Sequence, residues 1–242
     1  GDFLLIEGHT VRRYNPYTQQ DIWKINQAYE LNTKATCNAS LCFVTDKRGV
    51  LYAYNIFSGA LKWRVVLPST TQSRVLAEGE KLFVQTDNDY VLSLAAHTTH
   101  IRWSIHFSQP EPSLEMIAEP RVWHGYVWCV LRNGQLVGMH IDTGEIKYHE
   151  ILAEPDISLI SDIPMPLDAT PLIFDHLLLV SAYNSGVKAF DLQHQKLIAV
   201  WNLKAIQGVM VMKKDDHRVY ILDMNHDVWA INPLHGHVVW HR

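Results

Sequence analysis

The chain has 242 residues, 48% of them hydrophobic, so it is long enough to bury a core and is neither disordered nor collagenous. Its 21 basic and 25 acidic residues give a net charge of -4 without a run of like charge, which argues against a nucleic-acid or anionic-membrane surface. Apolar stretches such as residues 177–180 are far shorter than the roughly 20 residues that cross a bilayer. The chain opens on Gly1-Asp2 without an apolar leader, so we expect any targeting segment to have been removed or to lie outside this sequence.

The N-terminal part predicts two groups of short strands, because short apolar stretches bounded by turn residues are typical of strands. The first group has three predicted strands, at residues 3–7, 11–15 and 21–25. The second group has four, at residues 35–37, 41–45, 50–55 and 61–65. The first group therefore lacks an innermost strand.

Two cysteines flank a predicted hairpin turn at residues 38–41. Such a turn can place Cys37 and Cys42 on opposite strands, where a disulfide can form. The alternative is that both are small buried hydrophobic residues. Cys129 lies in an apolar run and is expected to be a buried free thiol.

One pattern returns six times: an apolar stretch, a polar residue, Gly or a substitute four positions later, and an aromatic residue four positions after that. Asn55, Gly59 and Trp63 form one full copy. The intervals between successive marker residues are 40, 40, 45, 51 and 41, the markers being Asn15, Asn55, Ala95, His140, Asp191 and Asn232. The aromatic residues that end the copies are, in order, Trp23, Trp63, Trp103, Tyr148, Trp201 and Trp240, and Trp201 is displaced from the regular spacing.

This spacing predicts an all-β fold, a β-propeller of four-stranded antiparallel blades in a single domain over residues 1–242. The six repeats fit either a closed six-bladed ring with a short first blade or a piece of a larger ring. The glycine is expected to supply the positive φ of the turn before the outer strand. The recurrent tryptophan is expected to pack neighbouring blades together.

Two connections are longer than the others, at residues 107–117 and 151–168. Each joins the outer strand of one blade to the inner strand of the next, so both should emerge on one face and flank the fourth blade. Prolines stiffen both connections. Apolar residues such as Leu114 and Ile160 lie in them, although such loops should be exposed to solvent. A rigid, partly apolar loop pair suits protein recognition, unless these residues only cover the propeller's own surface.

The sequence gives little support for an enzyme. The chain has no Gly-rich phosphate loop and no nucleophile elbow. The densest histidine cluster, His235, His237 and His241, lies on a turn and one outer strand, which does not easily supply a tetrahedral zinc site. We therefore expect no catalytic residues, no metal and no cofactor.

The apolar-Asp/Asn, Thr-Gly and Trp pattern resembles the repeats of the pyrroloquinoline-quinone-like propellers. Within that superfamily the chain is similar to the BamB family of outer-membrane assembly lipoproteins. The segments that carry this likeness are residues 103–107, 133–137, 168–171, 182–186, 189–192 and 219–223. The other relevant group, the quinone-dependent dehydrogenases, typically carries adjacent cysteines over the quinone, and Cys37, Cys42 and Cys129 are not adjacent.

The resemblance implies a non-catalytic scaffold at the periplasmic face of the bacterial outer membrane, held by a lipid on an upstream cysteine. Its partners would be the POTRA domains of a BamA-type barrel subunit and also unfolded outer-membrane proteins. A quinone-dependent dehydrogenase and a propeller scaffold for an unrelated partner remain the alternatives. The family's eight blades imply that two more blades would follow this segment.

In that family the two long loops bind the partner, and the matching positions here are Leu114, Glu115, Asp162 and Asp168. Leu114 keeps a leucine, whereas Glu115 stands where the family has arginine. The acidic pair of the second loop is spread between Asp162 and Asp168. The resemblance thus predicts a partner site with a changed charge pattern.

Overall fold

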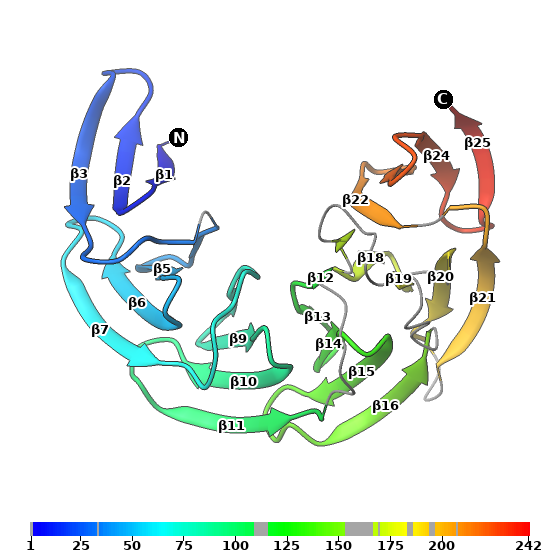
Figure 1. The fold of residues 1–242 in the computed structure, drawn as a ribbon, viewed down its shortest axis with the longest axis horizontal. Coiled ribbons are helices and arrows are strands. Elements are labelled where there is room, and N and C mark those ends of the chain that lie inside the picture. Colours follow the sequence, from blue (N-terminus) through cyan, green and yellow to red (C-terminus); the bar gives the residue numbers. More distant parts are fainter. Residues whose placement is uncertain are drawn as a thin grey trace. The chain divides into compact units, whose positions relative to one another are not determined.

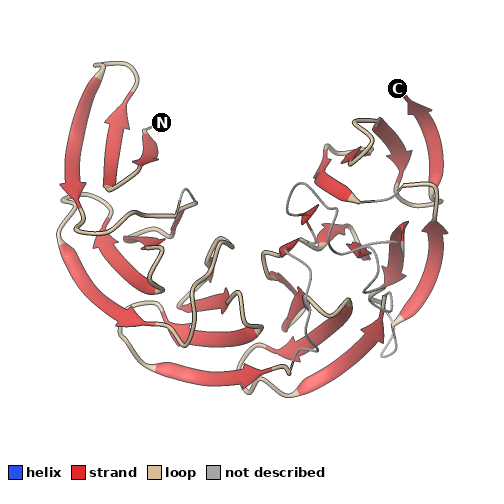
Figure 2. Cartoon of the chain, viewed as in Figure 1, coloured by secondary structure: helices blue, strands red, loops and turns tan. Residues whose placement is uncertain are grey.

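A computed structural model describes residues 2–32, 34–108, 116–152, 167–168, 170–182, 186–193, 197–206 and 208–242. The chain divides into two compact units, residues 1–107 and residues 108–242. We describe each unit by itself. The described residues form strands and turns without a helix (Figure 2), so none of them forms an apolar helix of membrane-spanning length.

The first unit contains three antiparallel sheets (Figure 1). The first sheet has three strands: β1 (Phe3–Glu7), β2 (Thr10–Asn15) and β3 (Gln20–Asn26). The second has β4 (Thr36–Cys37), β5 (Leu41–Thr45), β6 (Val50–Asn55) and β7 (Leu61–Val66). The third has β8 (Leu76–Glu78), β9 (Lys81–Gln85), β10 (Tyr90–Ala95) and β11 (Ile101–His106).

The second unit contains three further four-stranded sheets and one short parallel pair. The pair joins β12 (Met116–Ile117) to β17 (Leu167–Asp168). One sheet has β13 (Arg121–Trp123), β14 (Tyr126–Val130), β15 (Gln135–His140) and β16 (Ile146–Ile151). The next has β18 (Leu172–Phe174), β19 (Leu177–Ala182), β20 (Gly186–Asp191) and β21 (Ile198–Leu203). The last has β22 (Val209–Lys214), β23 (Val219–Asp223), β24 (Val228–Asn232) and β25 (His237–His241).

The predicted repeat and the observed sheets coincide. Each sheet of three or four strands is an up-and-down blade, and consecutive strands pair antiparallel. The pairing between the third and fourth strand positions of every blade shifts register just before the marker residue, for example between Ala53 and Tyr54 before Asn55. These shifts are β-bulges, which bend and twist a strand. The first sheet has three strands, as its shorter sequence predicted.

The middle strands of the second blade are buried on both faces because this blade packs between the first and the third. Successive strand residues point to opposite faces of a sheet. In β5, Phe43 belongs to a core shared with β9 and β10, and Val44 belongs to a core shared with β2 and β3. Burial of each such side chain stabilises the fold by about 1.5–3 kcal/mol.

Tryptophans on outer strands bind the following blade within a unit. Trp23 on β3 donates its indole Nε1–H to the carbonyl of Ile56, with an N···O distance of 2.9 Å. Trp201 on β21 makes the same contact with the carbonyl of Pro233 at 2.8 Å. Trp63 donates to Ala96 at 3.2 Å. The recurrent tryptophan is therefore a packing residue.

Candidate partner-binding site

The two long connections are joined where each re-enters the fold. Met116 pairs with Leu167 and Ile117 pairs with Asp168 in the parallel β12–β17 ladder. Parallel pairing requires both chains to run in the same direction at neighbouring positions. The C-terminal ends of the two connections therefore lie side by side in the second unit, and both lead into inner strands of blades.

Asp168 is the one predicted partner-binding residue that the structure describes. Its Oδ1 accepts a hydrogen bond from the N–H of Thr170 at 2.9 Å, and the side chain is half-buried. The Oγ1 of Thr170 accepts a bond from the N–H of Glu119 at 3.0 Å. These bonds extend the β12–β17 contact and give Asp168 a structural role in its turn. Leu114, Glu115 and Asp162 lie outside the described residues.

Sequence reasoning missed an acidic residue beside this junction. Glu119 is only 8% exposed, and its Oε2 lies 3.3 Å from Nη2 of Arg121. A buried carboxylate normally requires a charged or hydrogen-bonded partner. The Glu-Pro-Arg sequence carries no signal of burial, because burial arises from the packing of residues far away in the chain.

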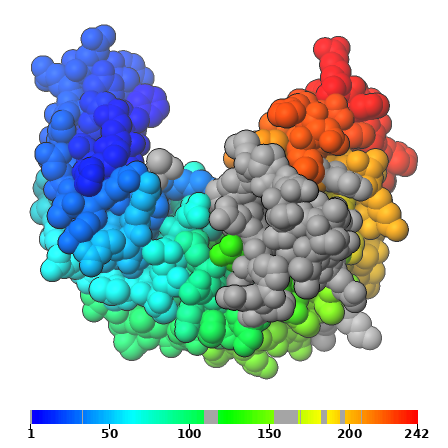
Figure 3. Space-filling model, in the orientation of Figure 1, coloured from blue at the N-terminus to red at the C-terminus, as the bar shows by residue number. Residues whose placement is uncertain are grey.

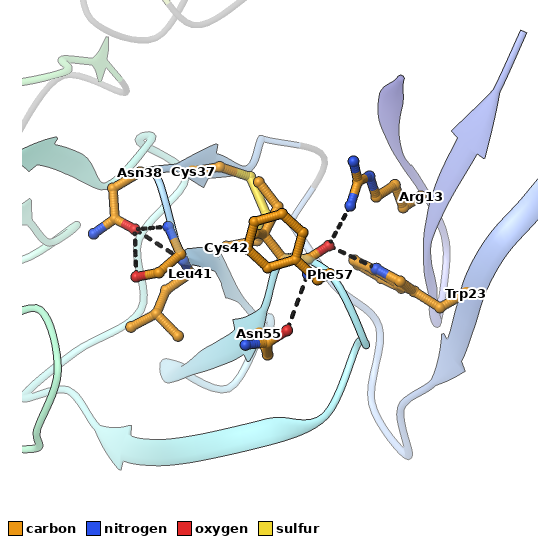
Figure 4. Close-up of a disulfide and its surroundings, with 10 residues drawn as sticks. Arg13, Trp23, Cys37, Asn38, Leu41, Cys42, Asn55 and Phe57 are labelled. Carbon is orange, nitrogen blue, oxygen red and sulfur yellow. Dashed lines mark hydrogen bonds between the residues drawn. A yellow bond between two sulfur atoms is a disulfide. The ribbon is translucent and has the colours of Figure 1, made fainter. Parts of the chain in front are cut away.

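Cys37 and Cys42 face each other across the β4–β5 ladder and are joined by a disulfide in the structure (Figure 4). The turn between them is held by Asn38, whose Oδ1 accepts the N–H groups of Ser40 and Leu41. The same view shows the neighbouring contact in which Trp23 reaches the second blade. Cys129 is buried and is not part of a disulfide.

Burial and hydrogen bonding perturb several ionisable groups away from this junction. Burial raises the pKa of Tyr52 to about 12, and a hydrogen bond from its hydroxyl to Asp46 Oδ2 adds to the shift. Hydrogen bonds from the backbone of His217 and from Tyr220 lower the pKa of Asp215. Each of these bonds closes a hairpin or joins neighbouring strands, so they stabilise turns.

Two polar hollows are also present. One of about 370 Å³ lies in the first unit and is lined by Asn32, Lys47, Thr70, Thr71, Gln72 and Asp87. The other, of about 300 Å³, lies in the second unit and is lined by Phe174, Asp175, Lys214, Asp215 and Asp216. Groups of three or more metal-ligating side chains are absent from the described part of the chain. In the histidine cluster noted in the sequence, the ring centroids of His235 and His237 lie 6.0 Å apart.

Solved structures with a similar fold include BamB from Moraxella catarrhalis, with a TM-score of 0.84 at 20% identity over 100% of this chain and 75% of that chain. A quinohemoprotein alcohol dehydrogenase from Pseudomonas putida has a TM-score of 0.66 at 14% identity, over 86% of this chain and 41% of that chain. At these identities the likenesses show the fold alone. The fold is a β-propeller of antiparallel blades, as predicted.

Sequence relatives point to one family. The outer membrane protein assembly factor BamB of Yersinia pestis is 22% identical over 89% of this chain and 54% of its own length. The protein of the same name from Escherichia coli is 20% identical over 92% of this chain and 56% of its own length. The chain thus spans about half the length of these curated relatives. A family model described as outer membrane protein assembly factor BamB matches residues 7–242, so the chain belongs to the BamB family.

Proposed function

We propose that this chain is a non-catalytic scaffold that assists the assembly and insertion of outer-membrane β-barrel proteins. The family match along residues 7–242 is the observation that carries this proposal. The described ionisable groups with shifted pKa values take part in turn and strand contacts, which fits a binding role. The proposed partners are the periplasmic POTRA domains of a BamA-type subunit, together with unfolded outer-membrane proteins.

The proposed binding surface is formed by the two long connections. The C-terminal ends of the two connections are paired through β12 and β17, which supports treating the two connections as one surface. Leu114 would fill an apolar pocket on the partner. Glu115, Asp162 and Asp168 would face a basic patch and raise the association rate.

The proposed location is the periplasmic face of the outer membrane, with a lipid anchor on an upstream cysteine as the link to the membrane. The name shared by the relatives supports association with outer-membrane assembly. The Cys37–Cys42 disulfide fits an oxidising compartment such as the periplasm.

Titration of the folded chain against purified POTRA domains tests the proposed surface. Leu114→Asp should weaken binding at least tenfold without lowering the free energy of unfolding, because a loop side chain adds little to blade packing. Leu234→Asp is the matched control, since Leu234 is 45% exposed on a turn of the last blade. The joint Asp162→Asn and Asp168→Asn variant should slow association and keep the Asp168 turn, because asparagine retains the Oδ1 acceptor. Parental binding by both folded variants would show that this surface is not the interface.

A further inference from the structure

A tyrosine and an arginine lie side by side on the surface of the first unit. The connection between β3 and β4 runs antiparallel to the turn after β5, where Leu31 bridges Asp46. Tyr29 and Arg48 lie opposite each other two residues further along this pairing, and Cζ of Arg48 is 4.1 Å from the centroid of the Tyr29 ring. Both side chains are exposed, Tyr29 to 46%. This part of the first unit, coloured in mid-blue, lies at the surface in Figure 3.

The turn that carries Arg48 is held in place by packing and hydrogen bonds. Asp46 is fully buried, and its Oδ1 accepts the N–H of Arg48 at 2.9 Å. Its Oδ2 accepts the hydroxyl of Tyr52 at 2.9 Å. Gly49 has a φ of 82°, and a Cβ there would stand 2.9 Å from the carbonyl oxygen of Ser69. The arginine side chain therefore starts from a fixed backbone, and the ring below it holds the guanidinium.

Other arginines that lie over aromatic rings in the first unit also hold a carboxylate. The guanidinium groups of Arg12 and Arg13 lie 5.5 Å and 5.8 Å from the centroids of their rings. Nη2 of Arg12 is 3.0 Å from Oε1 of Glu7, and Nη2 of Arg13 is 2.6 Å from Oδ2 of Asp2. In both cases the ring and the carboxylate bind the guanidinium together.

Arg48 has the ring but pairs with no carboxylate of the described residues. The two acidic residues of its own pairing are already occupied. Oε1 of Glu30 lies 2.5 Å from Nζ of Lys47. Asp46 is buried, and both of its carboxylate oxygens accept hydrogen bonds. The N–H groups of the Arg48 guanidinium are therefore open to a group from outside the described chain.

We propose that Tyr29 and Arg48 form a binding site for a carboxylate, the side chain of an aspartate or glutamate on a protein partner. Parallel N–H groups of the guanidinium would donate to both oxygens of one carboxylate. An exposed ion pair contributes little unless its geometry is fixed, and here the turn and the ring fix it. Tyrosine and arginine are also enriched among the residues that dominate protein interfaces. The site lies outside the two long connections and does not depend on the surface proposed above.

Phosphate groups and anionic membranes fit this site less well than a carboxylate. Lys47, the other cation of the turn, is neutralised by Glu30, so a single guanidinium would face a doubly charged phosphate. Anionic membranes attract clusters of several basic residues. The net charge of -4 on the chain also opposes attraction to such a surface.

An acidic peptide tests the proposal. The probe is a dye-labelled, capped tetraglutamate peptide, with tetraglutamine as its control, and fluorescence anisotropy measures its affinity for the whole chain. Arg48→Lys keeps the charge but loses the planar guanidinium, so it should weaken binding at least fivefold. Tyr29→Leu removes the ring and should weaken binding at least threefold. Arg218→Lys is the matched control, since Arg218 is an exposed arginine on another turn, and it should bind like the parent. Urea unfolding should give parental free energies, because the substituted side chains are exposed.

Four results would overturn the proposal. The first is no measurable binding of tetraglutamate at millimolar concentration. The second is equal binding of tetraglutamine, which would remove the carboxylate requirement. The third is parental affinity of Arg48→Lys, which would leave only a general attraction between charges. The fourth is displacement of the peptide by inorganic phosphate or phosphatidylglycerol vesicles at lower concentrations than by unlabelled tetraglutamate, which would assign the site to free phosphate or to a membrane respectively.

Discussion

Replacing Gly59 with alanine should destabilise the first unit more than an ordinary glycine substitution. Gly59 has a φ of 72°, and this left-handed conformation costs an L-residue about 1–2 kcal/mol. An added Cβ would also stand 2.9 Å from Cδ2 and 3.0 Å from Cγ of Trp23. The ring is only 8% exposed and is held by its bond to Ile56, so relief of this overlap should cost a further ~1–3 kcal/mol. The sum is a loss of about 2–5 kcal/mol.

Gly79→Ala is the matched control for this substitution. Gly79 has a φ of 58°, and no atom outside its chain neighbours lies within 4 Å of the Cβ position. Gly79→Ala should therefore lower the free energy of unfolding only by the cost of the left-handed conformation, about 1–2 kcal/mol. Urea unfolding followed by fluorescence measures both free energies. Equal losses in the two variants would refute the close packing of Trp23 on this turn, whereas a Trp23→Leu background should bring the Gly59→Ala loss down to the control value.

Three further predictions concern the first unit and the thiols. Trp63→Ala should lower the free energy of unfolding by about 3–5 kcal/mol, because the indole packs on the core and bonds to Ala96; a loss below about 1 kcal/mol would contradict this packing. Thiol titration of the denatured, unreduced protein should find only Cys129, and three reactive thiols would disprove the disulfide. Tyr52 has a pKa raised from 10.0 to about 12, so the folded state holds its proton more tightly, and the resulting stability is present below pH 10 and lost as pH rises to 12. Between pH 9 and 12, the free energy of unfolding should therefore fall less in Tyr52→Phe than in the parent protein. The same fall in both proteins would exclude Tyr52 as a source of the alkaline loss of stability.

The strands were predictable because their local patterns agree with the final fold. The predicted strands at residues 41–45 and 50–55 match β5 and β6 at both ends. Turn residues bound these strands, and local turn chemistry needs no knowledge of the rest of the chain. The bulges before each marker residue were not predicted, since a register shift depends on the partner strand.

The proposed partner site was predictable only in outline. The lengths of the two connections marked them as unusual, but their pairing through β12 and β17 brings together residues about 50 positions apart in the chain. Glu119 is buried two residues after β12, and no local pattern encodes that burial. The turn role of Asp168 had a local signal, because an aspartate often accepts the N–H two residues later.

The turns of the repeat show why glycine matters at only some blades. Trp63 lies over a turn in which Thr99 takes the glycine position, and its bond to Ala96 is 3.2 Å long, against 2.9 Å and 2.8 Å at the two glycine turns. Thr99 is outside the left-handed region. A residue with a side chain thus fits the glycine position when the turn leaves the left-handed conformation. The indole N–H···O distance is then longer than at the glycine turns. Gln19 keeps the left-handed backbone and also carries a side chain. Among the described turns, this one therefore combines a left-handed backbone with a side chain, which disfavours the close indole contact made at Gly59 and Gly236.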